Sequence, residues 1–386
     1  MNPRIYLDNA ATTRLDNRVL ETMLPYFTEN YGNASSLHSF GTSAKDAIEK
    51  SRAQIALFLH CKPEEIIFTA SGTEANNFAL KGTALANRGK GNHIIVSSIE
   101  HDCILNTCKW LETQGFFVTY LPVDKKGFVD PDFIKRCINP KTILVSVMHV
   151  NNEIGTVQPI SEIGNICKEQ GVLFHSDACQ SFGKIPVDIQ NVDLLTINSH
   201  KIYGPKGVGA LMIKNGTPIT PLLHGGGQEN GLRSSTENIA GIVGFAKAAE
   251  LCFSEMEDEI KRISGLQKKI ISHLTQTIEE IYFNGDLEKR LPNNINFCIS
   301  NLEGEGIRLL LLLDQEGIAV SSGSACSSNG DNSASHVLQA IGLNPFEARG
   351  SIRVSLGRYT TEAETDLFLK TITNKIKNLN SIFSVV

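Results

Sequence analysis

Residues 198–207 read Asn-Ser-His-Lys-Ile-Tyr-Gly-Pro-Lys-Gly, and they follow directly on an apolar run at residues 193–197. A short apolar run predicts a buried strand, and the glycines and proline after it predict a tight turn. We therefore expect Lys201 at the end of a strand, on a turn that fixes the direction of its amine. A second apolar run, residues 172–175, leads in the same way to Asp177.

A lysine and an aspartate at the ends of two strands are the pair of side chains that pyridoxal 5′-phosphate (PLP) requires. The amine of Lys201 would form a covalent bond with the aldehyde of PLP. The carboxylate of Asp177 would keep the pyridine nitrogen protonated, so that the ring can take up electrons. Together, the two residues predict a PLP-dependent enzyme.

From about residue 64, short apolar runs alternate with amphipathic helical segments. This alternation predicts an α/β fold, with a mostly parallel seven-stranded sheet and helices on both of its faces. Functional groups should then gather at the carboxyl ends of the strands. The seven runs are residues 66–68, 93–96, 117–119, 143–147, 172–174, 193–197 and 208–213.

After Asn238 the pattern changes to a long helical stretch that reaches about residue 280, with a break. A smaller set of elements follows, and we interpret it as a second α/β domain. We place the large PLP-binding domain at residues 14–255 and the small C-terminal domain at 256–386, with residues 1–13 packing on the latter. The expected elements of the small domain are strands at 294–299, 318–320 and 351–355, and helices at 305–315 and 361–378.

The composition is that of an ordinary globular enzyme, with 41% hydrophobic and 20% charged residues. A net charge of −5 gives no reason to expect a nucleic acid or an anionic membrane as partner. The leucine run at 309–313 is far shorter than the roughly 20 residues that span a bilayer. The nine cysteines form no Cys-x-x-Cys pair, which argues against disulfides and against a metal site. The start of the chain lacks an apolar signal core, so we expect a cytoplasmic protein with reduced thiols.

Residues 69–74, Thr-Ala-Ser-Gly-Thr-Glu, join the strand at 66–68 to a helix. Ser71 and Glu74 fit a capping box, which would be a purely structural role. Alternatively, the backbone N–H groups near Gly72 and Thr73, with the hydroxyl of Thr73, hold a phosphate at the helix N-terminus. Both interpretations can hold at once.

Three further polar residues follow predicted strands. His101 could be an ordinary cap, or its imidazole could cover the cofactor ring and move protons. Asn152 and Gln180 could be a turn residue and a helix-start residue. Alternatively, both offer neutral hydrogen bonds suited to the hydroxyl oxygen of the ring.

Residues 321–335 consist almost wholly of Ser, Gly, Asn and Asp, which predicts an exposed, mobile loop. Cys326 is its only reactive side chain. A cysteine on such a loop suits a nucleophile that enters an active site and then carries its product away. The alternative is a surface thiol with no role.

Two arginines remain open to more than one interpretation. Arg353 alternates within a probable strand and is either a salt-bridge partner or a two-pronged ligand for a carboxylate. Arg233 and Thr236 lie after the glycines at 225–227 and could contact a phosphate, although nothing in the spacing shows whose phosphate.

Taken together, these motifs resemble cysteine desulfurases of the NifS/IscS type, which are fold-type I PLP enzymes of the class V aminotransferase group. The resemblance covers nearly the whole chain. It rests on residues 6–13, 72–74, 100–101, 151–155, 177–180, 200–201, 233–236, 321–326 and 353–358.

The resemblance implies how a cofactor would be held. It implies that Lys201 bonds to PLP, that Asp177 contacts the pyridine nitrogen, and that His101 covers the ring. Asn152 and Gln180 would lie near the ring oxygen. The phosphate would be held by Gly72, Thr73, Asn198 and His200, and by Thr236 from the other subunit of a homodimer.

The resemblance also implies the reaction, in which L-cysteine becomes L-alanine. Arg353, with Asn33, would hold the substrate carboxylate, and Cys326 would carry the sulfur as a persulfide. The acceptor would be an iron–sulfur scaffold or a sulfurtransferase of tRNA thiolation. A class V aminotransferase, a selenocysteine lyase and a non-catalytic protein of the same fold are the alternatives.

Three positions depart from the family pattern. Asn198 stands where the family usually has serine, and Ser235 replaces a common glycine. The segment at 329–335 is about one residue longer and lacks the usual proline near Ala334.

Overall fold

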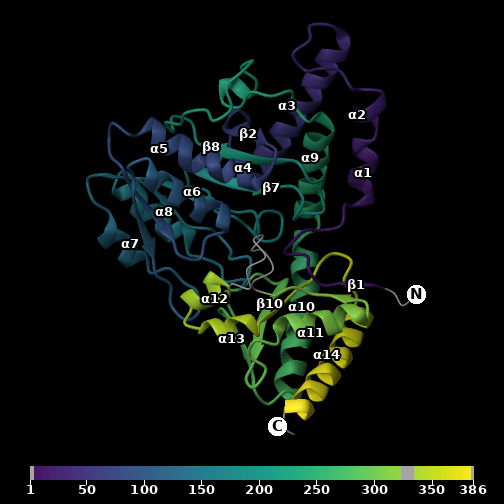
Figure 1. The fold of residues 1–386 in the computed structure, drawn as a ribbon. Helices are drawn as coiled ribbons and strands as arrows, with labels where there is room; N and C mark the ends of the chain where they lie inside the picture. The colour runs from purple at the N-terminus through teal and green to yellow at the C-terminus, as the bar shows by residue number, and fades with distance from the viewer. Residues whose placement is uncertain (1–3, 323–333, 384–386) are drawn as a thin grey trace.

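The computed structural model describes residues 4–322 and 334–383, and its centre is a seven-stranded sheet (Figure 1). The strand order is β2-β8-β7-β6-β5-β3-β4. Only β8 runs antiparallel to its neighbours, and the other pairings are parallel. The predicted α/β fold is therefore confirmed. The strands are β2 (Ile66–Thr69), β3 (His93–Ser97), β4 (Phe117–Leu121), β5 (Thr142–Ser146), β6 (Leu173–Asp177), β7 (Leu194–Asn198) and β8 (Gly209–Ile213).

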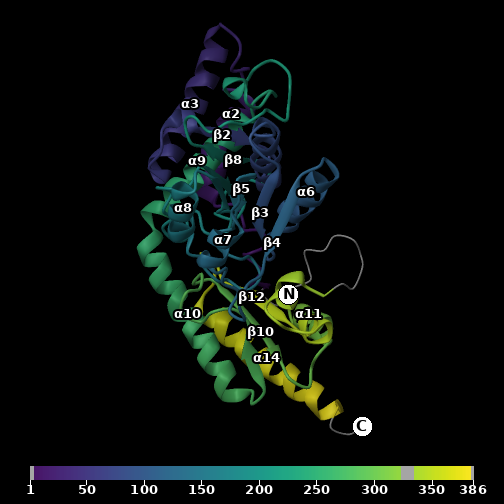
Figure 2. The ribbon, with the colours of Figure 1, turned by 90° about the vertical axis from the view of Figure 1, so that its left-hand side faces the viewer.

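Most strands of the large sheet are buried along their whole length because helices cover both faces of the sheet. β2, β3, β5, β7 and β8 are buried at every position. Successive side chains point to opposite faces, so Ile95 and Val145 join one core while Ile94 and Leu144 join the other. Figure 2 shows α8 and α9 on one side of the strands and α6 on the other.

The helices on the first face supply apolar side chains to one core, and those on the second face to the other. On the first face lie α1 (Asn17–Met23), α3 (Ser39–Leu59), α7 (Pro131–Cys137), α8 (Ile160–Glu169) and α9 (Ile239–Ser254). On the second lie α4 (Gly72–Asn77), the π-helical η2 (Phe78–Gly82), α5 (Thr83–Ala86) and α6 (Asp102–Thr113). The short elements α2 (Pro25–Thr28), η1 (Pro63–Glu65) and η3 (Glu229–Gly231) complete this part of the chain.

A second core lies below the first in Figure 1 and has its own sheets. Strands β9 (Ile281–Phe283), β10 (Asn294–Ile299) and β12 (Ile352–Ser355) form an antiparallel sheet. Strands β1 (Ile5–Tyr6) and β11 (Ile318–Ala319) form a parallel pair. The helices of this part are α10 (Met256–Thr277), α11 (Gly306–Gln315), α12 (His336–Ala340), α13 (Pro345–Arg349) and α14 (Glu362–Phe383).

We propose that the boundary between the two domains lies at residues 255–256. α9 ends at Ser254 and α10 begins at Met256, so the predicted break in the long helical stretch falls at Glu255. Buried side chains of α9 belong to the first core, and those of α10 belong to the second.

The N-terminal segment crosses from the small domain to the turn that carries Lys201. Ile5 and Leu7 belong to the second core, in line with the proposed packing of this segment. Further along, the N–H of Thr13 donates to the carbonyl oxygen of His200 at 2.9 Å. The hydroxyl of Thr13 accepts from the N–H of Tyr203 at 2.7 Å. The segment therefore ties the small domain to the end of β7.

In the described part of the chain, no helix is both long and apolar enough to cross a membrane. The same residues contain no cluster of three or more His, Cys, Asp or Glu side chains that could hold a metal ion.

Candidate active site

A cavity of about 220 Å³ lies where the parallel strands of the large sheet end. Its walls come from β6 and β7, the loops after β3 and β5, the start of α4, the N-terminal segment and β12. Most of the residues predicted from sequence line it: Gly72, Thr73, His101, Asn152, Asp177, Asn198, His200, Lys201 and Arg353. Residues 281 positions apart therefore meet in one place, since Gly72 and Arg353 both line the cavity.

Lys201 lies on a compact turn directly after β7. A side chain at Gly204 would collide with the hydroxyl of Ser199, so the turn requires glycine there. Tyr203 adopts a left-handed conformation with φ of +66°. These constraints fix the turn, and with it the direction in which Lys201 leaves the backbone.

Asp177 is the last residue of β6, and its carboxylate is held on two sides. Oδ1 accepts from the N–H of Cys179 at 2.8 Å. Oδ2 accepts from Nδ2 of Asn76 on α4 at 2.7 Å. The side chain is buried, so these bonds fix its orientation within the cavity.

The start of α4 forms the expected cap and leaves no room for a side chain at Gly72. Ser71 Oγ accepts from the N–H of Glu74 at 3.1 Å, whereas Glu74 Oε2 accepts from the N–H of Ala70 rather than from that of Ser71. A Cβ at Gly72 would lie 2.7 Å from Sγ of Cys179. The first N–H groups of the helix have no partner within the helix and are therefore available to an anion.

His200 and Asn198 lie opposite this helix start. The Nδ1 of His200 is 3.1 Å from the hydroxyl of Thr12, and its Nε2 is 3.4 Å from Nδ2 of Asn198. Burial, followed by the charge of Lys201, lowers the pKa of His200 to about 4, so the ring is neutral near pH 7. Oδ1 of Asn198 is buried and has no hydrogen-bond partner.

His101 caps α6 and lines the cavity at the same time, so the structural and functional interpretations are compatible. Its Nδ1 accepts from the N–H of Cys103 at 3.2 Å, which leaves the ring proton on Nε2. Burial lowers the pKa of His101, and the charge of Lys201 lowers it further, while Asp177 acts in the opposite direction.

Arg353 is 1% exposed and is a salt-bridge partner, which is one of the two interpretations that the sequence left open. Its Nη2 forms an ion pair with Oδ1 of Asp8 at 2.9 Å. Its Nη1 donates to the carbonyl oxygen of Asn152 at 3.0 Å. Its Nε is buried with no hydrogen-bond partner. The guanidinium thus lines the cavity with part of its donor set unused.

Four predicted residues lie elsewhere. Gln180 is buried beside the cavity, where its Nε2 donates to the carbonyl oxygen of Ala10 at 3.0 Å. Asn33 lies in an exposed turn, and its Oδ1 accepts from the N–H of Ser35. Thr236 is exposed and does not line the cavity. Cys326 lies outside the described residues.

The structure adds residues that the sequence did not single out. Asn76 and Asp8 act through Asp177 and Arg353, and their partners are too distant in sequence to be recognised. Cys103 and Cys179 also line the cavity. Burial raises the pKa of the Cys103 thiol to about 12 and that of Cys179 well above its usual value, so both are protonated thiols.

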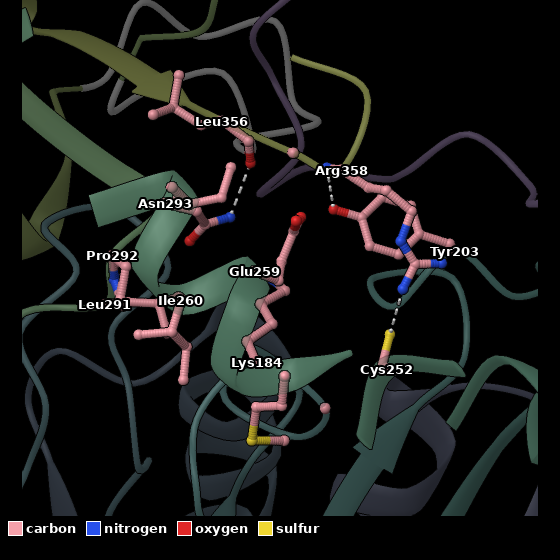
Figure 3. A pocket seen from close by; sticks show the side chains of 14 residues that line it. Lys184, Tyr203, Cys252, Glu259, Ile260, Leu291, Pro292, Asn293, Leu356 and Arg358 are labelled. Carbon is pink, nitrogen blue, oxygen red and sulfur yellow. Dashed lines mark hydrogen bonds between the residues drawn. The ribbon is translucent and has the colours of Figure 1, made fainter. Parts of the chain in front are cut away.

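A second cavity, of about 40 Å³, lies behind the lysine turn at the join between the two domains (Figure 3). The hydroxyl of Tyr203 accepts from the N–H of Arg358 at 2.7 Å, and Arg358 Nη2 reaches Sγ of Cys252 at 3.6 Å. Lys184 also lines this cavity. Burial, followed by the charge of Lys201, lowers the pKa of Lys184 to about 7.

A lysine and an aspartate at strand ends, a helix start open to a phosphate and a mostly parallel seven-stranded sheet together define a PLP-dependent enzyme of fold type I. The chain belongs to the class-V aminotransferase family, whose sequence pattern matches residues 5–368.

Several proteins similar to this chain are named cysteine desulfurase IscS. A protein of Dictyoglomus turgidum named cysteine desulfurase IscS is 50% identical over 384 residues, which cover 99% of this chain and 97% of that protein. Its namesake from Methanosarcina thermophila is 48% identical and covers 99% and 94% of the two chains. A solved NifS-like protein superposes with a TM-score of 0.91 at 41% identity, covering 97% of this chain and 100% of the other. A structure described as SspA in complex with cysteine has a TM-score of 0.82 at 38% identity, covering 92% and 100%.

Proposed function

We propose that this protein is a PLP-dependent cysteine desulfurase, which converts L-cysteine to L-alanine and retains the sulfur as a persulfide on Cys326. The observation that carries the proposal is the meeting of Lys201, Asp177 and a buried arginine, Arg353, in one cavity. This set provides for a cofactor and for the carboxylate of an amino acid. The relatives named cysteine desulfurase, and the solved relative in complex with cysteine, support cysteine as that amino acid.

The residues present fit PLP. The unpartnered, buried Oδ1 of Asn198 and Nε of Arg353 point to a polar group that fills the cavity. Lys201 would bond to the aldehyde, Asp177 would contact the pyridine nitrogen, and His101 would cover the ring. Gly72, Thr73, Asn198 and His200 would hold the phosphate, with Asn152 and Gln180 near the ring oxygen. When bound, PLP supplies an electron sink for the bonds at the substrate's α-carbon.

The protein's own side chains then bind the substrate and move its protons. Arg353 holds the carboxylate, assisted by Asn33. Once the substrate's amine has taken its place on the aldehyde, the freed Nζ of Lys201 would take the proton from the α-carbon of cysteine. His101 carries its proton on Nε2, from which it can donate a hydrogen bond. It would transfer a proton by first taking one up to form an imidazolium and then releasing one. The thiolate of Cys326 attacks the substrate sulfur, so that an S–S bond forms as the C–S bond breaks, and alanine leaves after reprotonation.

We further propose a homodimer, in which Thr236 of each subunit reaches the phosphate of the other. Thr236 is exposed and remote from the cavity of its own chain. Several large apolar side chains on and around α1, α2 and α3 are also exposed, among them Phe27 at 59%, Tyr31 at 64% and Leu37 at 102%. A cluster of this kind is typical of a surface that a partner covers.

The sulfur acceptor would be a protein, either an iron–sulfur scaffold or a sulfurtransferase of tRNA thiolation. We also propose a cytoplasmic location. All eight cysteines of the described residues are free thiols, which suits a reducing compartment.

The proposal is tested by incubating the purified protein with L-cysteine and a reductant. Sulfide and alanine should appear in equal amounts. K201A should lose the visible absorbance of bound PLP, whereas C326S should retain that absorbance and lose sulfide production. If C326S transaminates normally and the parent releases no sulfide, the protein is a class V aminotransferase. Comparing selenocysteine with cysteine as substrate separates a selenocysteine lyase.

A further inference from the structure

The ion pair between Asp8 and Arg353 places a carboxylate of the protein beside the arginine that lines the cavity. Asp8 Oδ1 lies 2.9 Å from Nη2 of Arg353, and the side chains are 20% and 1% exposed. Because a buried guanidinium without an anion is costly, Asp8 is the group that balances Arg353 before a substrate arrives.

The backbone holds Asp8 in this place. Asp8 forms an isolated parallel bridge with Ser355, two residues beyond Arg353 on β12. On either side, the N–H of Leu7 donates to Ala319 O at 2.8 Å and that of Asn9 donates to Ser355 O at 3.2 Å. The carboxylate is therefore fixed by the small domain, together with the arginine it faces.

The guanidinium of Arg353 nevertheless has N–H groups that neither Asp8 nor Asn152 uses. Nη2 is used by Asp8 and Nη1 by the carbonyl oxygen of Asn152, while the buried Nε has no partner. Nη1 and Nη2 also each carry a second N–H, so a substrate carboxylate would share Arg353 with Asp8 rather than displace it. The two anions would then share one cation and repel each other.

We propose that Asp8 acts through Arg353. Its negative charge weakens the binding of amino-acid carboxylates to Arg353 and so sets the affinity for both substrate and product. This inference rests on the proposed role of Arg353 in holding the substrate carboxylate. It explains why the carboxylate of Asp8 lies next to Arg353, the residue proposed to bind the carboxylate of the substrate. The benefit is release, because alanine carries the same carboxylate as cysteine and must leave after each turnover.

The decisive variant is D8N, which removes the charge and keeps an oxygen that accepts from Arg353. The KM for L-cysteine and the inhibition constant of L-alanine should both fall by about three- to tenfold, because a neighbouring negative charge is lost. The rate of persulfide formation at saturating cysteine should stay near that of the parent. D8E keeps the charge and is the matched control, in which neither constant should fall.

The proposal is overturned if D8N leaves the two constants unchanged or raises them, because Asp8 would then only orient Arg353. It is equally overturned if D8E lowers them as much as D8N does. If D8N does not fold, D8S offers a smaller neutral side chain for the same comparison.

A second measurement does not depend on catalysis. The melting temperature of the purified full-length protein is recorded in sodium acetate and in sodium chloride at equal concentration. In D8N the buried Arg353 lacks its anion, so this variant should melt lower than the parent in chloride and should regain stability in acetate. The parent and D188N, which removes a distant exposed carboxylate, should show a much smaller preference for acetate.

The two proposals fail in different ways. If the protein releases no sulfide from cysteine but D8N is rescued by acetate, the proposed function fails while the pairing of Asp8 with a carboxylate-binding arginine stands. If the protein is a desulfurase and D8N shows no preference for acetate, the inference about Asp8 fails alone.

Discussion

The carboxylate of Glu153 accepts a hydrogen bond of 2.5 Å from the hydroxyl of Ser335, and both side chains are buried. Ser335 also caps α12 by accepting from the N–H of Leu338. Beside it, Nε2 of His336 lies 2.9 Å from the carbonyl oxygen of Glu100. The start of α12 is thus fixed to the two loops that carry Asn152 and His101.

The first prediction concerns the pH dependence of stability that Glu153 imposes. Burial raises the pKa of Glu153 from 4.5 to about 7. Between these values the folded protein holds a proton that the unfolded chain has released, so the free energy of unfolding falls as pH rises through this window. E153Q cannot lose a proton in this window, so its unfolding free energy does not fall in this way. The unfolding free energy of E153Q minus that of the parent should therefore increase by about 1–3 kcal/mol from pH 5 to pH 8 in urea unfolding.

S335A provides the control for the same bond. It leaves Glu153 in place but removes both its hydrogen bond and the helix cap, so it should destabilise the protein by about 1–2 kcal/mol at pH 8. A stability difference between E153Q and the parent that does not change with pH would contradict the first prediction.

The second prediction concerns the buried pair of Arg52 and Glu229. Nη1 and Nη2 of Arg52 each donate to an oxygen of Glu229 at 2.8 Å, and Glu229 Oε2 also accepts from the N–H of Phe68. R52M leaves Glu229 buried without a cation, which should cost about 3–5 kcal/mol in urea unfolding. R136M removes an exposed pair with Asp130 and should cost well under about 1 kcal/mol. Similar losses in the two variants would show that burial is not the cause.

The third prediction concerns Lys184, whose pKa is lowered to about 7 by burial. The unfolded chain binds its proton up to the ordinary value of 10.5, so the free energy of unfolding rises as pH increases from about 7 to 10.5. K184M removes the penalty of burying the charge. Its melting temperature should therefore exceed that of the parent most at pH 7 and least near pH 10.

The same variant should lose function while it gains stability. The Nζ of Lys184 donates to Oε1 of Gln180 at 3.5 Å, which favours one orientation of that amide. K184M should retain PLP less well during dialysis, as followed by absorbance. A variant that gains stability and retains PLP as well as the parent would show that Lys184 does not act through Gln180.

The fourth prediction concerns Asn76, which holds one oxygen of Asp177 at 2.7 Å. N76L keeps the size of the side chain and removes the donor. We expect the dissociation constant for PLP to rise by about ten- to a hundredfold, the equivalent of one hydrogen bond to a charged group. N77A is the control on the same helix, because Nδ2 of Asn77 bonds to the carbonyl oxygen of Thr73 instead. Equal losses in the two variants would mean that the helix itself has been disturbed.

The large sheet could be predicted from sequence because burial on both faces makes most of its strands largely apolar. The small domain was predicted less completely. β1 has two residues and β9 has three, which is too short to show a period. The single-turn helices α12 and α13 were missed for the same reason.

The candidate site was predictable where a residue follows a strand directly. Lys201 and Asp177 were found in this way, because the ends of parallel strands meet at one edge of the sheet. Asp8 was not assigned a role, since its partner Arg353 lies 345 positions away in the chain. Of the four predicted residues outside the cavity, Gln180 bonds to the carbonyl oxygen of Ala10, Asn33 and Thr236 are exposed, and Cys326 lies beyond the described residues.

The pairing of Ile5 with Ile318 has a consequence for biosynthesis. During translation, β1 is synthesised long before β11. It therefore remains unpaired while the large sheet forms. The second core can close only once translation is nearly complete, and until then its apolar amino-terminal residues are available to chaperones. The segment that is synthesised first, β1, is therefore among the last to reach its native pairing.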